Sequence, residues 1–88
     1  MALRMFRYEI PVDGEAHKFL LKSYPVKAEI TPSFQVEFWA EHNDVLDEEE
    51  YTFQVYGTGH PIPDGGMYVA TTDRKNGLVF HLYELPEE

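Results

Sequence analysis

The residues best suited to chemistry gather in one stretch, YGTGHPIP at positions 56–63. Gly57, Thr58 and Gly59 permit backbone conformations closed to other residues and let peptide N–H groups approach a ligand closely. Concave groups of N–H donors bind anions, and the Thr58 hydroxyl and the His60 ring add side-chain hydrogen bonds. The stretch predicts a cradle for a phosphate or carbonyl group. The alternative is a wide hairpin connection whose glycines make the bend and whose His60 caps it.

This loop differs from the known phosphate-binding loops of nucleotide triphosphatases. It has no lysine and no helix follows it, so a Walker-type enzyme is excluded. Gly65-Gly66, coming after Pro61 and Pro63, extends the connection to about ten residues, which is long for a hairpin in a small domain. Long ordered loops are often functional, so the length favours a binding role.

Signs of catalysis or metal binding are weak. The four histidines are His17, His42, His60 and His81, and they form no HxH or HxxxH pair. There are no cysteines, and neither of the two serines lies in a nucleophile motif. We therefore expect no enzyme activity, no metal and no other cofactor. His60 and His81 are the only residues that we would test for chemistry.

Alternating apolar and polar residues predict the strands that must position this loop. The expected strands cover residues 5–10, 17–21, 26–31, 34–40, 51–57, 67–71 and 77–83. Asp13-Gly14 and Asn76-Gly77 are typical tight-turn pairs. Six or seven short strands with regular turns predict an all-β fold, a small antiparallel sandwich or partly open barrel, as a single domain over residues 1–88. One helical turn is expected near residues 45–50.

The two faces of these strands are both apolar. The predicted core is Phe34, Val36, Phe38, Phe53, Val55, Leu78, Phe80 and Leu82. The opposite face then carries Trp39, Tyr56, Tyr68, Val79, His81 and Tyr83, where a solvated sheet would be mostly polar. Either bulges shift the strands or a loop covers this face, or the aromatic residues form a subunit interface or line a ligand site. Because a small domain buries little core, we expect a homo-oligomer.

The charge balance restricts the partners. Sixteen acidic residues against seven basic ones give a net charge of −9, which argues against direct contact with nucleic acid or membrane and favours a basic protein partner. Six acids fall within residues 41–50, as a solvated loop or as a docking surface. The opening MALRMFRYEI has no long apolar run, so we expect a cytoplasmic protein.

Four segments, FRYEIP, FQVEFWA, FQVYGTGHPIP and GLVFHLYE, carry a family resemblance that spans nearly the whole chain. The sequence resembles a family of small, uncharacterised β-rich proteins encoded mainly by bacteriophages, in which GTGHP is the specific element. Relatives usually have tryptophan where this chain has Phe6 and Phe80. The resemblance implies no settled activity. It implies an accessory protein of the host cytoplasm, where counter-defence and host takeover are common roles.

Two functions are consistent with these observations. The first is an oligomeric, non-catalytic module that sequesters a small nucleotide-like ligand. Its predicted binding residues are Gly57, Thr58, Gly59 and His60 for the phosphates, with Trp39 or Tyr56 stacking a base and His81 nearby. Cations near the first strands, Arg4, Arg7, Lys18, Lys22 and Lys27, would offset the negative charge. The alternative is an acidic inhibitor that covers a basic surface of a host protein.

Overall fold

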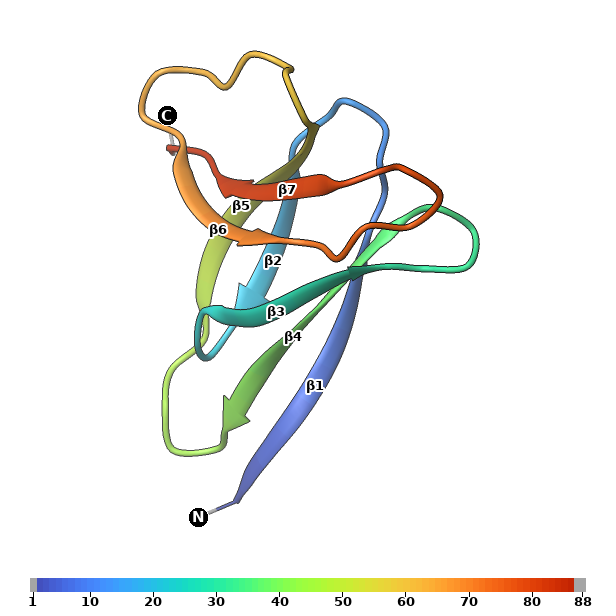
Figure 1. Cartoon of the computed structure of the whole chain (residues 1–88). Helices are drawn as coiled ribbons and strands as arrows, with labels where there is room; N and C mark the ends of the chain where they lie inside the picture. Colours follow the sequence, from blue (N-terminus) through green and yellow to red (C-terminus); the bar gives the residue numbers. More distant parts are fainter. Residues whose placement is uncertain (1, 87–88) are drawn as a thin grey trace.

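Seven β-strands make up the regular structure of residues 2–86, the part of the chain that the computed structural model describes (Figure 1). They are β1 (Leu3–Ile10), β2 (His17–Leu21), β3 (Pro25–Ile30), β4 (Val36–Asn43), β5 (Glu49–Gly57), β6 (Met67–Thr71) and β7 (Phe80–Glu84). The number of strands agrees with the sequence patterning. The helical turn expected near residues 45–50 does not form, since β5 already begins at Glu49.

The strands form two antiparallel sheets. One has the order β1-β4-β3 and the other the order β2-β5-β7-β6. β3 lies beside β6, where the two sheets meet, whereas β1 and β2 are the edge strands on the other side (Figure 1). The all-β prediction is confirmed, and of its two versions the open sandwich is the one observed.

The core lies between the inner faces of the two sheets. Its buried members are Ile10, Leu21, Ala28, Val36, Phe38, Phe53, Val55 and Leu82. Phe38 is 0% exposed, and the rings of Phe19 and Phe53 meet it edge-on with centroids 5.2 and 5.5 Å away. Alternation along β4 and β5 therefore does place the predicted residues inside.

Two residues of the predicted core, Phe34 and Leu78, are exposed instead. Phe34 precedes β4 in a turn and has a positive φ of 64°, so it lies outside the strand. Leu78 closes a hairpin tip before β7 begins at Phe80. Val26 faces out because a register shift between Pro25 and Lys27 interrupts β3. Local turns and bulges of this kind interrupt the two-residue alternation of side chains, and the amino-acid composition does not reveal where they occur.

Of the two predicted tight turns, Asn76-Gly77 closes a hairpin, whereas Asp13-Gly14 lies in a bend between β1 and β2, which belong to different sheets, with Gly14 at a φ of 74°. Asn76 and Gly77 have φ values of 51° and 80°, and Lys75 bridges Leu78 across them. Positive φ at both central residues is the geometry that Asn-Gly pairs adopt in two-residue hairpins. This hairpin carries the β6–β7 connection back toward the end of β5.

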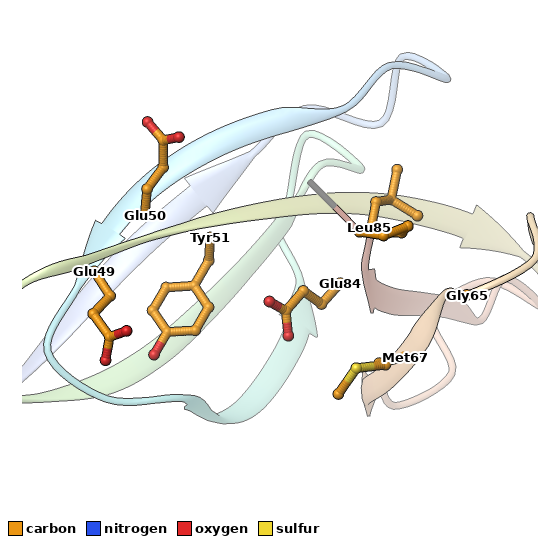
Figure 2. A pocket seen from close by; sticks show the side chains of 8 residues that line it. Glu49, Glu50, Tyr51, Gly65, Met67, Glu84 and Leu85 are labelled. Carbon is orange, nitrogen blue, oxygen red and sulfur yellow. The ribbon is translucent and has the colours of Figure 1, made fainter. Parts of the chain in front are cut away.

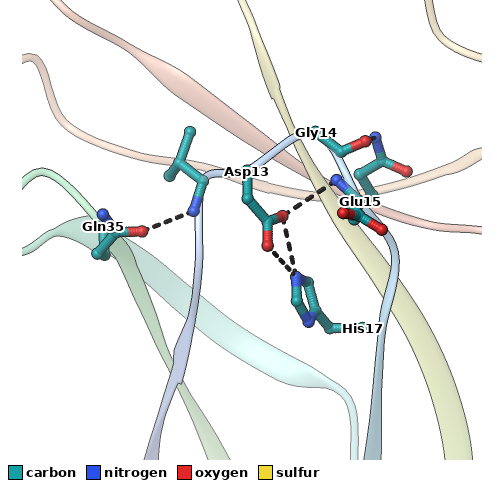
Figure 3. Close-up of polar contacts among 7 residues, drawn as sticks. Asp13, Gly14, Glu15, His17 and Gln35 are labelled. Atoms are coloured by element: carbon teal, nitrogen blue, oxygen red, sulfur yellow. Dashed lines mark hydrogen bonds and ion pairs between the residues drawn. The ribbon is translucent and has the colours of Figure 1, made fainter.

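Asp13 organises the connection between β1 and β2 (Figure 3). Its carboxylate accepts a hydrogen bond from the Glu15 backbone N–H at 3.0 Å and contacts the His17 Nε2 at 3.0 Å. Gln54 donates to the Gly14 carbonyl from β5, so the turn is also attached to the second sheet. His17 therefore has a structural partner, and its hydrogen bond is the main cause that lowers the pKa of Asp13.

The lowered pKa of Asp13 predicts a small acid-dependent loss of stability. A carboxyl group with a depressed folded-state pKa stabilises the fold above its ordinary pKa, and this contribution is lost as the pH falls through the lowered value. We expect Asp13→Asn to lower the urea midpoint at neutral pH, and the difference from the unmodified protein to shrink below about pH 4. A difference that stays constant across this range would contradict the assignment.

Candidate functional site

The glycine-rich stretch forms a tight turn directly after β5. The His60 N–H donates to the Gly57 carbonyl at 3.1 Å, and Gly59 has a φ of 88°, which residues with a side chain rarely adopt. A Cβ added at Gly57 would lie 3.0 Å from Cε1 of the His60 ring, so glycine there lets the ring pack against the backbone. Both glycines thus have a structural role, as the hairpin interpretation requires.

A chain of hydroxyl and imidazole groups fixes this turn to β6 and β7. The Tyr68 and Thr71 oxygens lie 2.8 Å apart, Thr71 Oγ1 lies 3.0 Å from His81 Nδ1, and His81 Nε2 lies 2.9 Å from Thr58 Oγ1. The Thr58 hydroxyl donates to the Val79 carbonyl at 3.4 Å, which leaves it to accept from His81. The structure therefore joins Thr58 and His81, two predicted site residues, and adds Thr71 and Tyr68, which sequence reasoning missed.

Beside the turn lies a hollow of about 390 Å³, the glycine-loop hollow. It is lined by Gly57, Thr58, His60, Arg74, Gly77, Leu78, Val79 and Phe80. Its size falls within the range of small-molecule sites, about 300–1,000 Å³. The lining combines hydrogen-bonding groups from the turn with an apolar wall from Leu78 and Phe80.

Arg74 is the cation of the glycine-loop hollow. It is exposed, and none of the salt bridges within residues 2–86 includes it. A guanidinium group presents paired N–H donors that match the oxygens of a phosphate or carboxylate. Arg74 lies between the ends of β6 and β7, so the hairpin at Asn76-Gly77 brings it to the turn after β5. No local sequence pattern marks this proximity.

The cations near the first strands have other partners. Arg4 pairs with Asp44, Arg7 with Glu37, Lys18 with Glu50 and Lys27 with Glu29 and Asp73, while Lys22 donates to the Leu46 carbonyl. None of these five lines the glycine-loop hollow. The expectation that they would offset the negative charge at the site is therefore wrong, and Arg74 occupies that position instead.

Trp39 and Tyr56 are not arranged to stack a ligand in the glycine-loop hollow. Trp39 belongs to β4 in the three-stranded sheet, opposite Arg7 and Lys27, whereas the hollow adjoins the four-stranded sheet. Tyr56 is only 8% exposed, and this burial raises the pKa of its phenol. Neither aromatic ring shares the hollow within one protomer, so its apolar contacts come from Leu78 and Phe80.

The loop between β5 and β6 covers much of the aromatic outer face. A Cβ added at Gly66 would meet the Ile62 side chain at 2.9 Å and the Tyr83 ring at 3.6 Å. The Tyr83 ring packs edge-on against Tyr56 and Tyr68, with centroid distances of 5.9 and 5.7 Å. The loop therefore packs against Tyr83, whose ring contacts Tyr56 and Tyr68, and Tyr68 alone among these three tyrosines is exposed.

A second hollow, the acidic hollow, has a volume of about 310 Å³ (Figure 2). It is lined by Glu49, Glu50, Tyr51, Gly65, Met67, Glu84, Leu85 and Pro86. Figure 2 shows Glu50 on the opposite side of β5 from Glu49 and Tyr51. Glu84 accepts a hydrogen bond from the Tyr24 hydroxyl, which is the main cause that raises the pKa of Tyr24 to about 12.

No group of three or more histidine, aspartate or glutamate side chains in residues 2–86 is placed to hold a metal ion. Within the same residues no helix is long and apolar enough to span a bilayer.

A family model described as a domain of unknown function (DUF7352) matches residues 1–88, the whole of the chain. No curated protein and no solved structure matches the chain significantly.

Proposed function

The chain belongs to the family described as a domain of unknown function (DUF7352), and we propose that it is a binding module for a small phosphate-bearing ligand. One observation carries the proposal: Arg74 lies with the Gly57–His60 turn around a single hollow of suitable size. A cation without an ion pair among the described residues, next to backbone and hydroxyl donors, is suited to an anion even in a chain of net charge −9.

Each group around the glycine-loop hollow has a distinct role in this proposal. Arg74 contacts two phosphate oxygens through its paired N–H groups. The Thr58 hydroxyl donates to the Val79 carbonyl over a long 3.4 Å contact, and a phosphate oxygen is a stronger acceptor that can take its place. His81 holds Thr58 in position from the other side. The apolar part of the ligand then covers Leu78 and Phe80.

The resemblance to bacteriophage proteins supports a more specific version of the proposal. The ligand is then a nucleotide-like signal of the host, and the protein withdraws it from its receptor in the host cytoplasm without chemical conversion. In this version both ring nitrogens of His81 contact threonine hydroxyls, so the ring serves to position Thr58 for the ligand.

Binding of a nucleoside monophosphate, followed by NMR of the labelled protein, tests the proposal directly. We expect amide shifts at residues 57–60 and 74–80, and smaller shifts with the matching nucleoside that lacks the phosphate. Native mass spectrometry of gently purified protein would identify a retained natural ligand. Shifts that are absent, or equal with and without the phosphate, would rule out phosphate recognition at this site.

The second candidate function, an inhibitor that contacts a basic protein, is favoured by the acidic hollow. Glu49 and Glu84 border an apolar floor that could accept a lysine or arginine side chain (Figure 2). However, Glu84 already accepts a bond from Tyr24, and Glu50 pairs with Lys18 at 3.7 Å. If the protein is such an inhibitor, the double variant Glu49→Gln with Glu50→Gln should lose inhibition and keep phosphate binding. Gly59→Val should lose phosphate binding and keep inhibition.

A further inference from the structure

β1 presents an open edge at the end of the three-stranded sheet (Figure 1). Its register with β4 is continuous from Leu3 to Ile10, without a bulge, and the strand contains no proline. The Asp44 N–H donates to the Ala2 carbonyl, so the even-numbered residues direct their N–H and C=O groups at β4. By the same alternation, the odd-numbered residues from Leu3 to Glu9 direct theirs at the open edge.

The other edge strands of residues 2–86 are better protected against pairing. β3 contains Pro25 and a register shift, and it lies beside β6 of the opposite sheet. β6 also has a register shift. β2 has five residues against the eight of β1. Short strands, bulges, prolines and charged side chains are the usual devices that keep a sheet edge from adding another strand, and of these β1 has only the charges of Arg4, Arg7 and Glu9.

Exposed apolar side chains accompany this edge. Leu3 is 58% exposed and Met5 is 53% exposed, and both lie on the outer face of the sheet. Phe6 is also exposed on the inner face, where its ring stacks on His42 with centroids 4.5 Å apart. The N-terminal half of β1 and the end of β4 extend together away from the four-stranded sheet (Figure 1). An apolar, hydrogen-bonding edge of this length is suited to another strand.

We propose that β1 pairs antiparallel with β1 of a second copy of the chain, about a two-fold axis at Phe6. Residues 3–9 of the two copies then lie opposite one another, and the two three-stranded sheets become one sheet of six strands. The odd-numbered residues supply the hydrogen bonds, as their orientation requires. The contact is isologous, so it closes as a dimer and leaves neither β1 edge open.

The number of paired residues and the charges of β1 together favour this register. With the axis at Phe6, Arg7 lies opposite Met5 of the second copy, Arg4 lies opposite Tyr8, and Glu9 lies opposite Leu3. Moving the axis to Arg7 would place the two Arg7 side chains directly opposite each other, which is destabilising. Moving it to Tyr8 would place Arg7 opposite Glu9 of the second copy, a favourable charge pair, but it would pair only residues 6–10 and leave Leu3 and Met5 without partners. An axis between two residues would put side chains of opposite faces together.

The overall charge does not oppose this contact. The protein carries a net charge of −9, but β1 contains two arginines and one glutamate. Arg4 and Arg7 pair with Asp44 and Glu37 of the same copy, so the charges along this edge are largely balanced. Because the glycine-loop hollow uses no residue of β1, this inference is independent of the proposed ligand.

Cysteine cross-linking tests the register, since the chain has no cysteine of its own. In the proposed dimer the two Phe6 residues form a non-hydrogen-bonded pair with Cα atoms about 4.5 Å apart, within the disulfide range of about 4.4–6.8 Å. We expect Phe6→Cys to convert almost completely to a disulfide-linked dimer in a glutathione buffer. The Arg7→Cys and Tyr8→Cys variants should form much less disulfide-linked dimer. Faster linkage at either of these two positions would overturn the proposed register.

A proline at the open edge provides a second test. The Met5 N–H points away from β4, so Met5→Pro removes an intermolecular hydrogen bond and spares those within the sheet. Light scattering should show a dimer for the unmodified protein and for the control Met5→Leu, and a monomer for Met5→Pro with an unchanged β spectrum in circular dichroism. A monomeric unmodified protein, or a Met5→Pro variant that remains dimeric, would overturn the proposal.

Discussion

An Arg74→Glu variant is expected to bind a nucleoside monophosphate about ten to a hundred times more weakly than the unmodified protein. A hydrogen bond to a charged group contributes about 1.5–3 kcal/mol, and about 1.4 kcal/mol corresponds to a factor of ten in affinity. The glutamate adds repulsion to this loss. Because Arg74 is exposed and has no salt bridge within residues 2–86, the variant should fold normally.

Calorimetric titration with the nucleotide measures this loss, and Lys18→Glu is the matched control. The control changes the net charge by the same amount on β2, outside the residues that line the glycine-loop hollow. It should weaken binding only slightly, and this residual effect should vanish at high salt. Equal losses in both variants would mean that net charge, rather than the Arg74 contact, governs binding. Arg74→Lys should recover part of the affinity, because it restores the charge without the paired donors.

The largest expected effect on stability comes from Phe38→Ala. Phe38 is fully buried, and its ring lies against Tyr8, Phe19 and Phe53, with centroids 5.2, 5.2 and 5.5 Å away. Removing such a ring typically costs about 3–5 kcal/mol, because both the transfer free energy and the packing around the cavity are lost. Single domains have a free energy of unfolding of only about 5–15 kcal/mol. The variant should therefore lose most of its stability.

Urea unfolding followed by circular dichroism measures this change, and Phe34→Ala is the matched control. Phe34 has the same side chain but is exposed, and its ring contacts Lys75 with the ammonium nitrogen 5.5 Å from the centroid. An exposed cation–π contact contributes about 0.5–1 kcal/mol. We expect the control to lower the free energy of unfolding by only this small amount, with a correspondingly small shift of the urea midpoint. Similar losses in the two variants would contradict the core described for the sandwich.

Local sequence chemistry was sufficient to find the turn of the candidate site. Gly57, Thr58 and His60 lie within four consecutive residues, so their contribution to one hollow follows from the bend that Gly57 and Gly59 permit. Arg74 could not be found in this way. It joins the hollow only because β7 pairs with β5, which places the β6–β7 connection beside the end of β5. The residues around Arg74 contain no pattern that predicts the pairing of β5 with β7.

For the aromatic residues, too, the sequence predicted local features and could not predict the pairing of the strands. Period-two alternation correctly placed Trp39 and Tyr56 on the faces opposite the core side chains of their own strands. It could not show that β4 and β5 belong to different sheets, which puts the outer faces of these two strands on different sides of the sandwich. A period of two distinguishes the faces of one strand and carries no information about its neighbours.

The sequence alone therefore determined the all-β class, the approximate positions of the strands, the tight turn at Asn76-Gly77 and the positive φ of Gly14. Each of these depends on a few adjacent residues, through side-chain alternation or through the tolerance of glycine and asparagine for positive φ. The tertiary structure alone decided that Arg74 lines the glycine-loop hollow, that the loop between β5 and β6 packs against Tyr83, and that β1 remains an open edge. These features depend on which strands pair and on how the sheets pack. The periodicity of side chains along the sequence does not predict such long-range contacts.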